Sequence, residues 1–159
     1  MATSYPYQKI LIPVDFSEVS LASLRHGLAL AGACGASVAI LSVVDTSFPY
    51  PDLFSFEDPA GDYYKVMRER ALARMKEWLA DDLAEDASGI DVERLVARGR
   101  PAAEIPAMAQ EVGADVIVVA RHGSGALRHA FMGNVVEALV RAAPCPVLVL
   151  PPPADGDGA

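Results

Sequence analysis

Short apolar runs alternate along the chain with longer segments in which apolar residues recur every three or four positions. The runs at 9–14 and 38–44 are apolar at nearly every position, which is typical of strands covered on both faces of a sheet. The segment between them carries leucines at helical spacing. Ser17 is placed to cap the start of this helix, and Gly32 and Gly35 are expected to close it.

The same alternation continues to residue 150. It predicts a helix over 63–85 with Val66 on its apolar face, a more polar strand over 90–97 and a helix after Pro101. A strand over 115–120, a further helix with Val140 on its apolar face and a last strand over 147–150 follow. Alternating strands and helices predict an α/β fold, an open five-stranded parallel sheet with helices on both faces. The polar strand is expected at a sheet edge. We expect residues 1–150 to form one domain and 151–159 to form a flexible tail.

In sheets of this kind, ligands bind beyond the carboxyl ends of the strands, where the strand order reverses. Two segments compete for that position, "PVDFS" at 13–17 and "ARHGSG" at 120–125. Asp15 is suited to accept hydrogen bonds from a ribose hydroxyl or an adenine amino group, to ligate a metal, or to cap the following helix. A phosphoacceptor role would need further acids at other strand ends, whereas the third strand ends in "VARGR".

The glycines after residue 120 fit neither common phosphate motif. Gly123 and Gly125 are not followed by the Lys-Ser/Thr pair of a P-loop, and the third glycine of a dinucleotide motif is missing. Gly133 and Asn134 fall where the last helix begins. Backbone amides at a helix start form an anion site, although Gly-Asn also begins helices that bind nothing.

Charge narrows the possible partners. The chain of 159 residues is 52% hydrophobic with a formal net charge of −8, which argues against nucleic acid or an anionic membrane as partner. Against this background, Arg121, His122, Arg128 and His129 lie together without an acid. This segment is either a local anion site or a solvated turn. No nucleophile is credibly paired with either histidine, so no catalytic residue is predicted.

The segment 48–64 combines prolines with six of the eleven aromatic residues of the chain. Its rings either cover the core or contact a partner. Cys34 and Cys145 stand apart from any Cys/His cluster and are expected to be reduced, packed thiols. No signal peptide is recognised at the start, and no apolar stretch reaches the ~18 residues of a membrane span. We therefore expect a cytoplasmic protein.

Four blocks of the sequence resemble those of the universal stress protein family. They are "KILIPVDFSEVS", "SVAILSVVD", "ARGRPAAEIPAMAQEVGADVIVVARHG" and "FMGNVVEALVRAAPCPVLVL", in the family's order over residues 7–150. The resemblance implies a sheet of strand order 3-2-1-4-5, of the nucleotide-binding α-hydrolase-like type. It also implies a homodimer through the last strand, Val147–Leu150, because such an apolar edge invites pairing with a second copy.

Some members of that family bind ATP through the pattern Gly, two residues, Gly, nine residues, Gly-Ser/Thr. This chain keeps the spacing from Ala120 through Gly123 to Gly133, but Ala120 and Asn134 replace the first glycine and the hydroxyl residue. The nucleotide-binding residues implied by the resemblance are Pro13, Val14, Asp15, Val43, Val119, Ala120, Arg121, His122, Gly123, Ser124, Arg128, Gly133 and Asn134. Val43 would bind through its backbone.

The sequence thus favours a stress-response regulator or sensor that binds ATP or a related adenine nucleotide, with or without Mg²⁺. Any ATP hydrolysis is expected to be slow, because no residue is evidently placed to activate water. The alternative is a dimeric interaction or scaffold protein of the same fold that binds no nucleotide and contacts an unknown protein partner. An enzyme that uses Asp15 or His122 is a third possibility.

Overall fold

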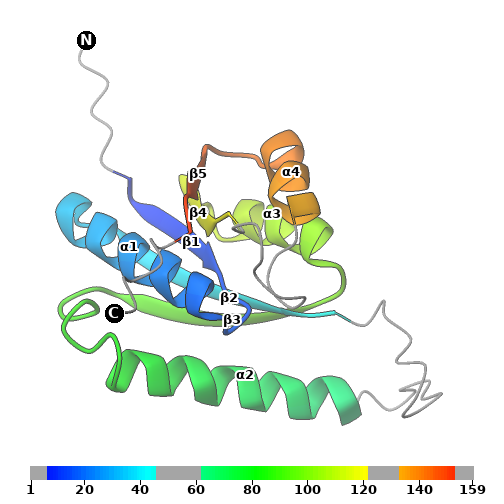
Figure 1. The fold of residues 1–159 in the computed structure, drawn as a ribbon, viewed down its shortest axis with the longest axis horizontal. Coiled ribbons are helices and arrows are strands. Elements are labelled where there is room, and N and C mark those ends of the chain that lie inside the picture. Colours follow the sequence, from blue (N-terminus) through cyan, green and yellow to red (C-terminus); the bar gives the residue numbers. More distant parts are fainter. Residues whose placement is uncertain (1–6, 46–61, 122–132, 153–159) are drawn as a thin grey trace, which may run out of the picture.

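The structure, a computed structural model, describes residues 7–45, 62–121 and 133–152. Its strands form one parallel sheet in the order β3-β2-β1-β4-β5 (Figure 1). The predicted fold class and strand order are confirmed. The elements are β1 (Lys9–Pro13), α1 (Glu18–Cys34), β2 (Ser37–Val44), α2 (Asp62–Ala80), β3 (Val92–Arg98), α3 (Pro101–Glu111), β4 (Val116–Ala120), α4 (Gly133–Ala142) and β5 (Val147–Leu150).

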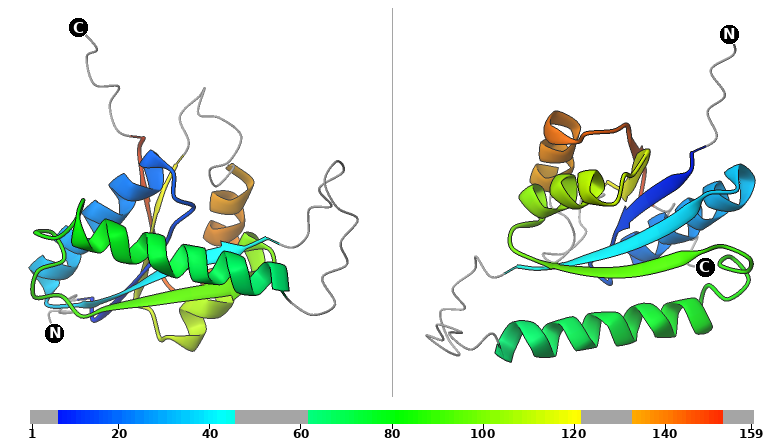
Figure 2. Two further views of the ribbon diagram at one scale, coloured as in Figure 1. Left: turned by 90° about the horizontal axis from the view of Figure 1, so that it is seen from below. Right: turned by 180° about the vertical axis from the view of Figure 1, so that it is seen from behind.

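The sheet is covered on both faces, which explains why its central strands are apolar at nearly every position. Ile10 and Ile12 of β1 pack with α1 and α2 on one face. Leu11, between them, packs with α3 and α4 on the other face. Figure 2 shows α3 and α4 together on one side of the sheet and α2 on the opposite side. Because side chains alternate along a strand, each central strand contributes to two separate cores.

Helix α1 begins as the sequence predicts. Ser17 is its N-cap and accepts a hydrogen bond from the backbone N–H of Ser20. Gly35 ends the helix in the left-handed conformation at φ 69°, which glycine adopts without steric cost. Gly32 lies inside the helix, so the prediction that it closes α1 is wrong. Gly27 has a packing role, because a Cβ there would collide with Cδ1 of Ile12.

Helix α2 departs from its predicted length and from its predicted apolar face. It ends at Ala80 rather than near residue 85, and residues 81–89 form turns. Its inward stripe consists of Ala71, Met75 and Trp78, whereas Val66, which was expected to face the core, is 45% exposed. The predicted and the observed buried faces of α2 differ because apolar residues occur on several sides of this helix.

The sheet edges lie where the sequence places them. β3 pairs only with β2 and β5 only with β4 within the described residues, and β5 has the predicted bounds. Val140 of α4 is 64% exposed, although it was expected in the core. Both cysteines are free and half-buried. None of the described helices is long and apolar enough to span a membrane.

Candidate functional site

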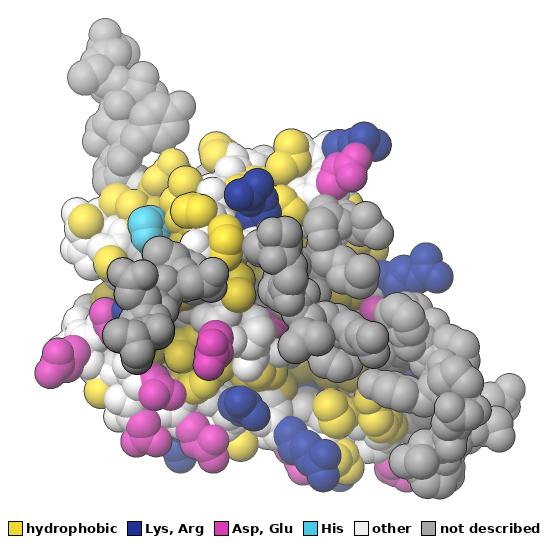
Figure 3. Space-filling model, viewed as in Figure 1, with side chains coloured by type: hydrophobic (Ala, Val, Ile, Leu, Met, Phe, Trp, Pro, Cys, Tyr) yellow, Lys and Arg dark blue, Asp and Glu magenta, His cyan; other side chains and the backbone are white. Residues whose placement is uncertain are grey.

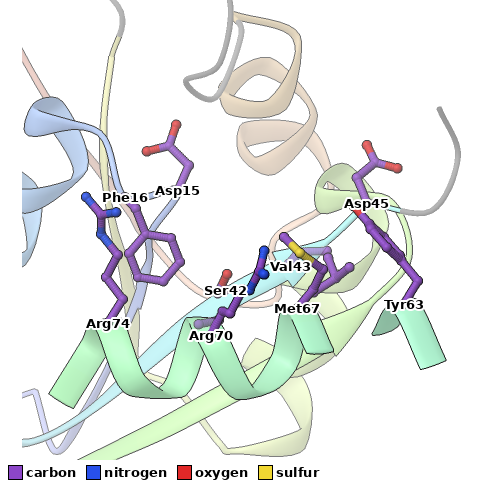
Figure 4. A pocket seen from close by; sticks show the side chains of 11 residues that line it. Asp15, Phe16, Ser42, Val43, Asp45, Tyr63, Met67, Arg70 and Arg74 are labelled. Atoms are coloured by element: carbon purple, nitrogen blue, oxygen red, sulfur yellow. The ribbon is translucent and has the colours of Figure 1, made fainter. Parts of the chain in front are cut away.

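A pocket of about 390 Å³ lies where the carboxyl ends of β1 and β2 face α2 (Figure 4). The strands are parallel, so their carboxyl ends share one edge of the sheet, and the position agrees with the general rule for ligand sites in open α/β sheets. α2 supplies the opposite wall. The lining residues are Asp15, Phe16, Ser42, Val43, Val44, Asp45, Tyr63, Met67, Arg70, Ala71 and Arg74.

Asp15 has one occupied and one free carboxylate oxygen. Its Oδ1 accepts hydrogen bonds from the backbone N–H and the hydroxyl of Ser17, at 3.0 Å and 2.5 Å. Its Oδ2 is buried and has no hydrogen-bond partner among the residues that the structure describes. A buried acceptor without a partner is costly, and such atoms are rare in folded proteins. The helix cap is Ser17, so Oδ2 of Asp15 is not used in capping α1.

The turn that presents Asp15 is strained and tightly packed. Phe16 has φ 65°, a left-handed conformation that costs roughly 1–2 kcal/mol for a residue with a Cβ. Its ring lies 5.2 Å from that of Trp78, and the guanidinium carbon of Arg74 lies 5.6 Å from the Phe16 ring centroid. These contacts with α2 fix the turn. Sequence reasoning missed Phe16, because both partners lie some sixty residues away along the chain.

The strand-end residues expected around a ligand divide into two groups. Asp15 and Val43 line the pocket. Val14, Val119 and Ala120 are at most 5% exposed, and Pro13 is buried as well. These four residues are buried at or next to the carboxyl ends of β1 and β4 and are absent from the lining of the described pocket.

Ala120 is the last residue of β4. Strand alternation places its side chain on the same face as Val116 and Val118, which pack with α1. Its methyl group is therefore packed within the protein rather than left in open space.

The glycine-containing segment is only partly described. Arg121 is exposed, and its backbone N–H donates to the carbonyl of Leu150 at 2.8 Å. Gly133 begins α4, as the sequence predicts. The side chain of Asn134 lies outside the described structure, as do residues 122–132, and with them the predicted His122, Gly123, Ser124 and Arg128. Residues 48–61 of the aromatic segment 48–64 also lie outside the described structure.

Arg70 and Arg74 are two pocket residues that sequence reasoning did not anticipate. They lie one helical turn apart on α2 and point from that helix toward the strand ends (Figure 4). The available signal was weak, because exposed arginines on an amphipathic helix usually serve solubility. Only the packing of α2 across the carboxyl ends of β1 and β2 gives these residues a role at the site.

The strand order and the helices on both faces define an open, doubly wound α/β fold, and Asp15 lies at the edge of the sheet where such folds bind ligands. The sequence profile of the universal stress protein family matches residues 6–151. The chain belongs to the universal stress protein family.

Individual relatives agree with this assignment. The chain is 34% identical over 149 residues to universal stress protein MJ0531 of Methanocaldococcus jannaschii, covering 92% of this chain and 84% of that protein. It is 28% identical to the solved structure of protein MJ0577, with a TM-score of 0.72 over 92% of this chain and 97% of that one. A third similar structure is a universal stress protein in complex with cAMP, at 26% identity and TM-score 0.59, covering 91% of this chain and 96% of that one.

Proposed function

We propose that this universal stress protein binds ATP or a related adenine nucleotide at the carboxyl edge of the sheet and acts as a regulator or sensor in a stress response. The observation that carries the proposal is Oδ2 of Asp15, a buried acceptor without a partner among the described residues, at a pocket. A nucleoside supplies the missing donor through a ribose hydroxyl or the adenine amino group. The cAMP complex of a similar universal stress protein supports the same ligand class.

The pocket fits a nucleoside in size and in chemistry. Its volume of about 390 Å³ falls within the roughly 300–1,000 Å³ of small-molecule sites. Val43 and Met67 supply apolar surface for a base, and Asp15 supplies the acceptor. In this proposal the 5′-phosphates extend toward Arg121 and the start of α4, where backbone amides and the helix dipole favour an anion, with or without Mg²⁺.

The altered ends of the phosphate motif are compatible with binding. The Ala120 methyl group packs on the α1 face of the sheet, so the extra carbon does not by itself block a ligand. Asn134 keeps a hydrogen-bond donor in its side-chain amide. The alternative scaffold role does not supply a hydrogen-bond donor for Oδ2 of Asp15, which has no partner among the described residues.

Isothermal titration calorimetry with ATP and AMP tests the proposal directly. We expect saturable binding by the wild-type protein. Restoring the family pattern with Ala120→Gly and Asn134→Ser is expected to leave affinity equal or higher. Absence of heat and of uptake in equilibrium dialysis at millimolar nucleotide would remove the proposal and leave the scaffold role.

We also propose a homodimer through β5, in a cytoplasmic protein. β5 is an edge strand, and Leu148 on it is 37% exposed. The carbonyl of Pro146 accepts from the N–H of Ile117 in β4, and that of Leu150 accepts from the N–H of Arg121, the residue after β4. In a parallel strand the intervening residues direct their backbone groups the other way, so Val147 and Val149 offer N–H and C=O groups to a second copy.

A further inference from the structure

The α2 wall of the pocket carries two positively charged side chains. Arg70 and Arg74 both line the pocket, and neither takes part in an ion pair with a described residue. Like charges four residues apart destabilise a helix, so this pair has a cost in the free protein. An anion bound between the two guanidinium groups removes that cost.

The acids of α2 and the following turn form no ion pair with these arginines among the described residues, although Glu77 lies three residues after Arg74 on the same helix. Figure 3 shows acidic side chains gathered over the far end of α2 and the turn after it. Asp81, Asp82 and Glu85 are exposed there, and Asp86 is paired with Arg25 at 3.4 Å. The pocket lining thus sets Arg70 and Arg74 on α2 against Asp15 and Asp45 at the strand ends, in a chain of net charge −8.

The position of Arg74 relative to Asp15 is set by packing. The Arg74 guanidinium lies over the ring of Phe16, the residue that follows Asp15, and Phe16 is itself packed on Trp78. Arg70 extends from the preceding turn of α2 toward Ser42 and the end of β2 (Figure 4). The guanidinium group matches phosphate in geometry, because its donors form a planar fork.

We propose that Arg70 and Arg74 form a second anion subsite, which takes a phosphate carried on the ribose of a nucleotide while Asp15 accepts the remaining ribose hydroxyl. The inference rests on the proposed nucleotide function and names its ligand class, nucleotides phosphorylated on the 2′ or 3′ oxygen as well as on the 5′ oxygen. Asp15 and Asp45 also line the pocket and repel a phosphate, so the subsite depends on both arginines.

The experiment compares AMP with adenosine 2′,5′-bisphosphate and adenosine 3′,5′-bisphosphate by isothermal titration calorimetry. The wild-type protein is expected to bind one of the two bisphosphates roughly tenfold more tightly than AMP, because charge-assisted hydrogen bonds to a phosphate are added. The double variant Arg70→Gln/Arg74→Gln is expected to lose this advantage, so that its affinities for AMP and for the favoured bisphosphate become equal. The favoured isomer identifies the ribose oxygen that faces α2.

A matched control has the same change in net charge on the same helix. Arg68 and Lys76 are exposed and do not line the pocket, so Arg68→Gln/Lys76→Gln is expected to retain the bisphosphate advantage. Arg70→Lys/Arg74→Lys keeps the charge without the fork and is expected to retain part of it. Circular dichroism checks whether each variant folds. If Arg70→Gln/Arg74→Gln does not fold, the comparison is made with Arg70→Lys/Arg74→Lys instead.

The outcomes separate this inference from the proposed function. If AMP and ATP bind but neither bisphosphate binds more tightly than AMP, the subsite is wrong and the proposed function stands. An advantage that survives Arg70→Gln/Arg74→Gln, or that is lost equally in the control, overturns the subsite as well. If none of the nucleotides binds, the proposed function itself is wrong.

Discussion

Replacing Asp15 by asparagine separates the role of the carboxylate in binding from its role in the fold. The asparagine carbonyl oxygen accepts two hydrogen bonds, so it can keep both bonds that Ser17 donates to Oδ1. The amide nitrogen then occupies the position of Oδ2, which has no partner among the described residues. The substitution replaces a charged acceptor by a neutral donor at the atom proposed to meet the ligand.

The two consequences have different magnitudes. A hydrogen bond to a charged group contributes about 1.5–3 kcal/mol, so we expect Asp15→Asn to weaken ATP binding roughly 10- to 150-fold. The free energy of unfolding without ligand is expected to fall by no more than about 0.5 kcal/mol or to rise, because the bonds to Ser17 remain and an unpaired buried charge is removed. Calorimetry measures the first quantity and urea denaturation the second.

Asp115→Ala serves as the control with the opposite profile. Asp115 lies at the other end of the sheet, where its Oδ2 accepts from the backbone N–H groups of Gln8 and Lys9 at 2.6 Å and 2.8 Å. We expect this variant to lose stability and to keep its affinity for ATP. The reasoning about Asp15 is refuted if Asp15→Asn binds ATP as the wild type does, or if its unfolding free energy drops as far as that of Asp115→Ala.

Three further predictions follow from the packing. Gly27→Ala should destabilise the protein by roughly 1–3 kcal/mol in urea denaturation, because the added Cβ collides with Ile12. In the same helix, a Cβ added at Gly32 meets nothing within 4 Å, so Gly32→Ala should stabilise the protein by about 0.5–1 kcal/mol. Val149→Pro removes an edge N–H and should shift the proposed dimer toward monomer in sedimentation velocity; a wild-type monomer at micromolar concentration contradicts the proposed dimer. Burial, together with the nearby carboxylate of Asp115, raises the pKa of the Cys145 thiol. At neutral pH, alkylation of Cys145, followed by peptide mass spectrometry, should be slower in the folded than in the unfolded protein. The difference between the two rates should shrink at alkaline pH.

The sheet is predictable from the sequence because a strand that is buried on both faces has an almost uninterrupted run of apolar residues. Strands such as β2 and β4 are apolar at nearly every position, and β5 was predicted with its observed bounds. Asp15 was also predictable, since a polar residue directly after a buried strand lies at the edge where ligands bind.

The α2 side of the site was not predictable for a physical reason. Phe16, Arg70 and Arg74 acquire their roles only because α2 packs across the ends of β1 and β2. Local periodicity does not record which stripe of α2 faces inward, as the exposure of Val66 and the burial of Trp78 demonstrate.

The stacking of Trp78 on Phe16 has a practical consequence. Trp78 is the only tryptophan in the chain, and its ring lies 5.2 Å from that of the residue next to Asp15. The intrinsic fluorescence of the protein therefore comes from a single indole that touches the turn beneath the pocket. A change in emission on ligand addition would report on that turn without any label, and the same signal would follow the detachment of α2 during unfolding.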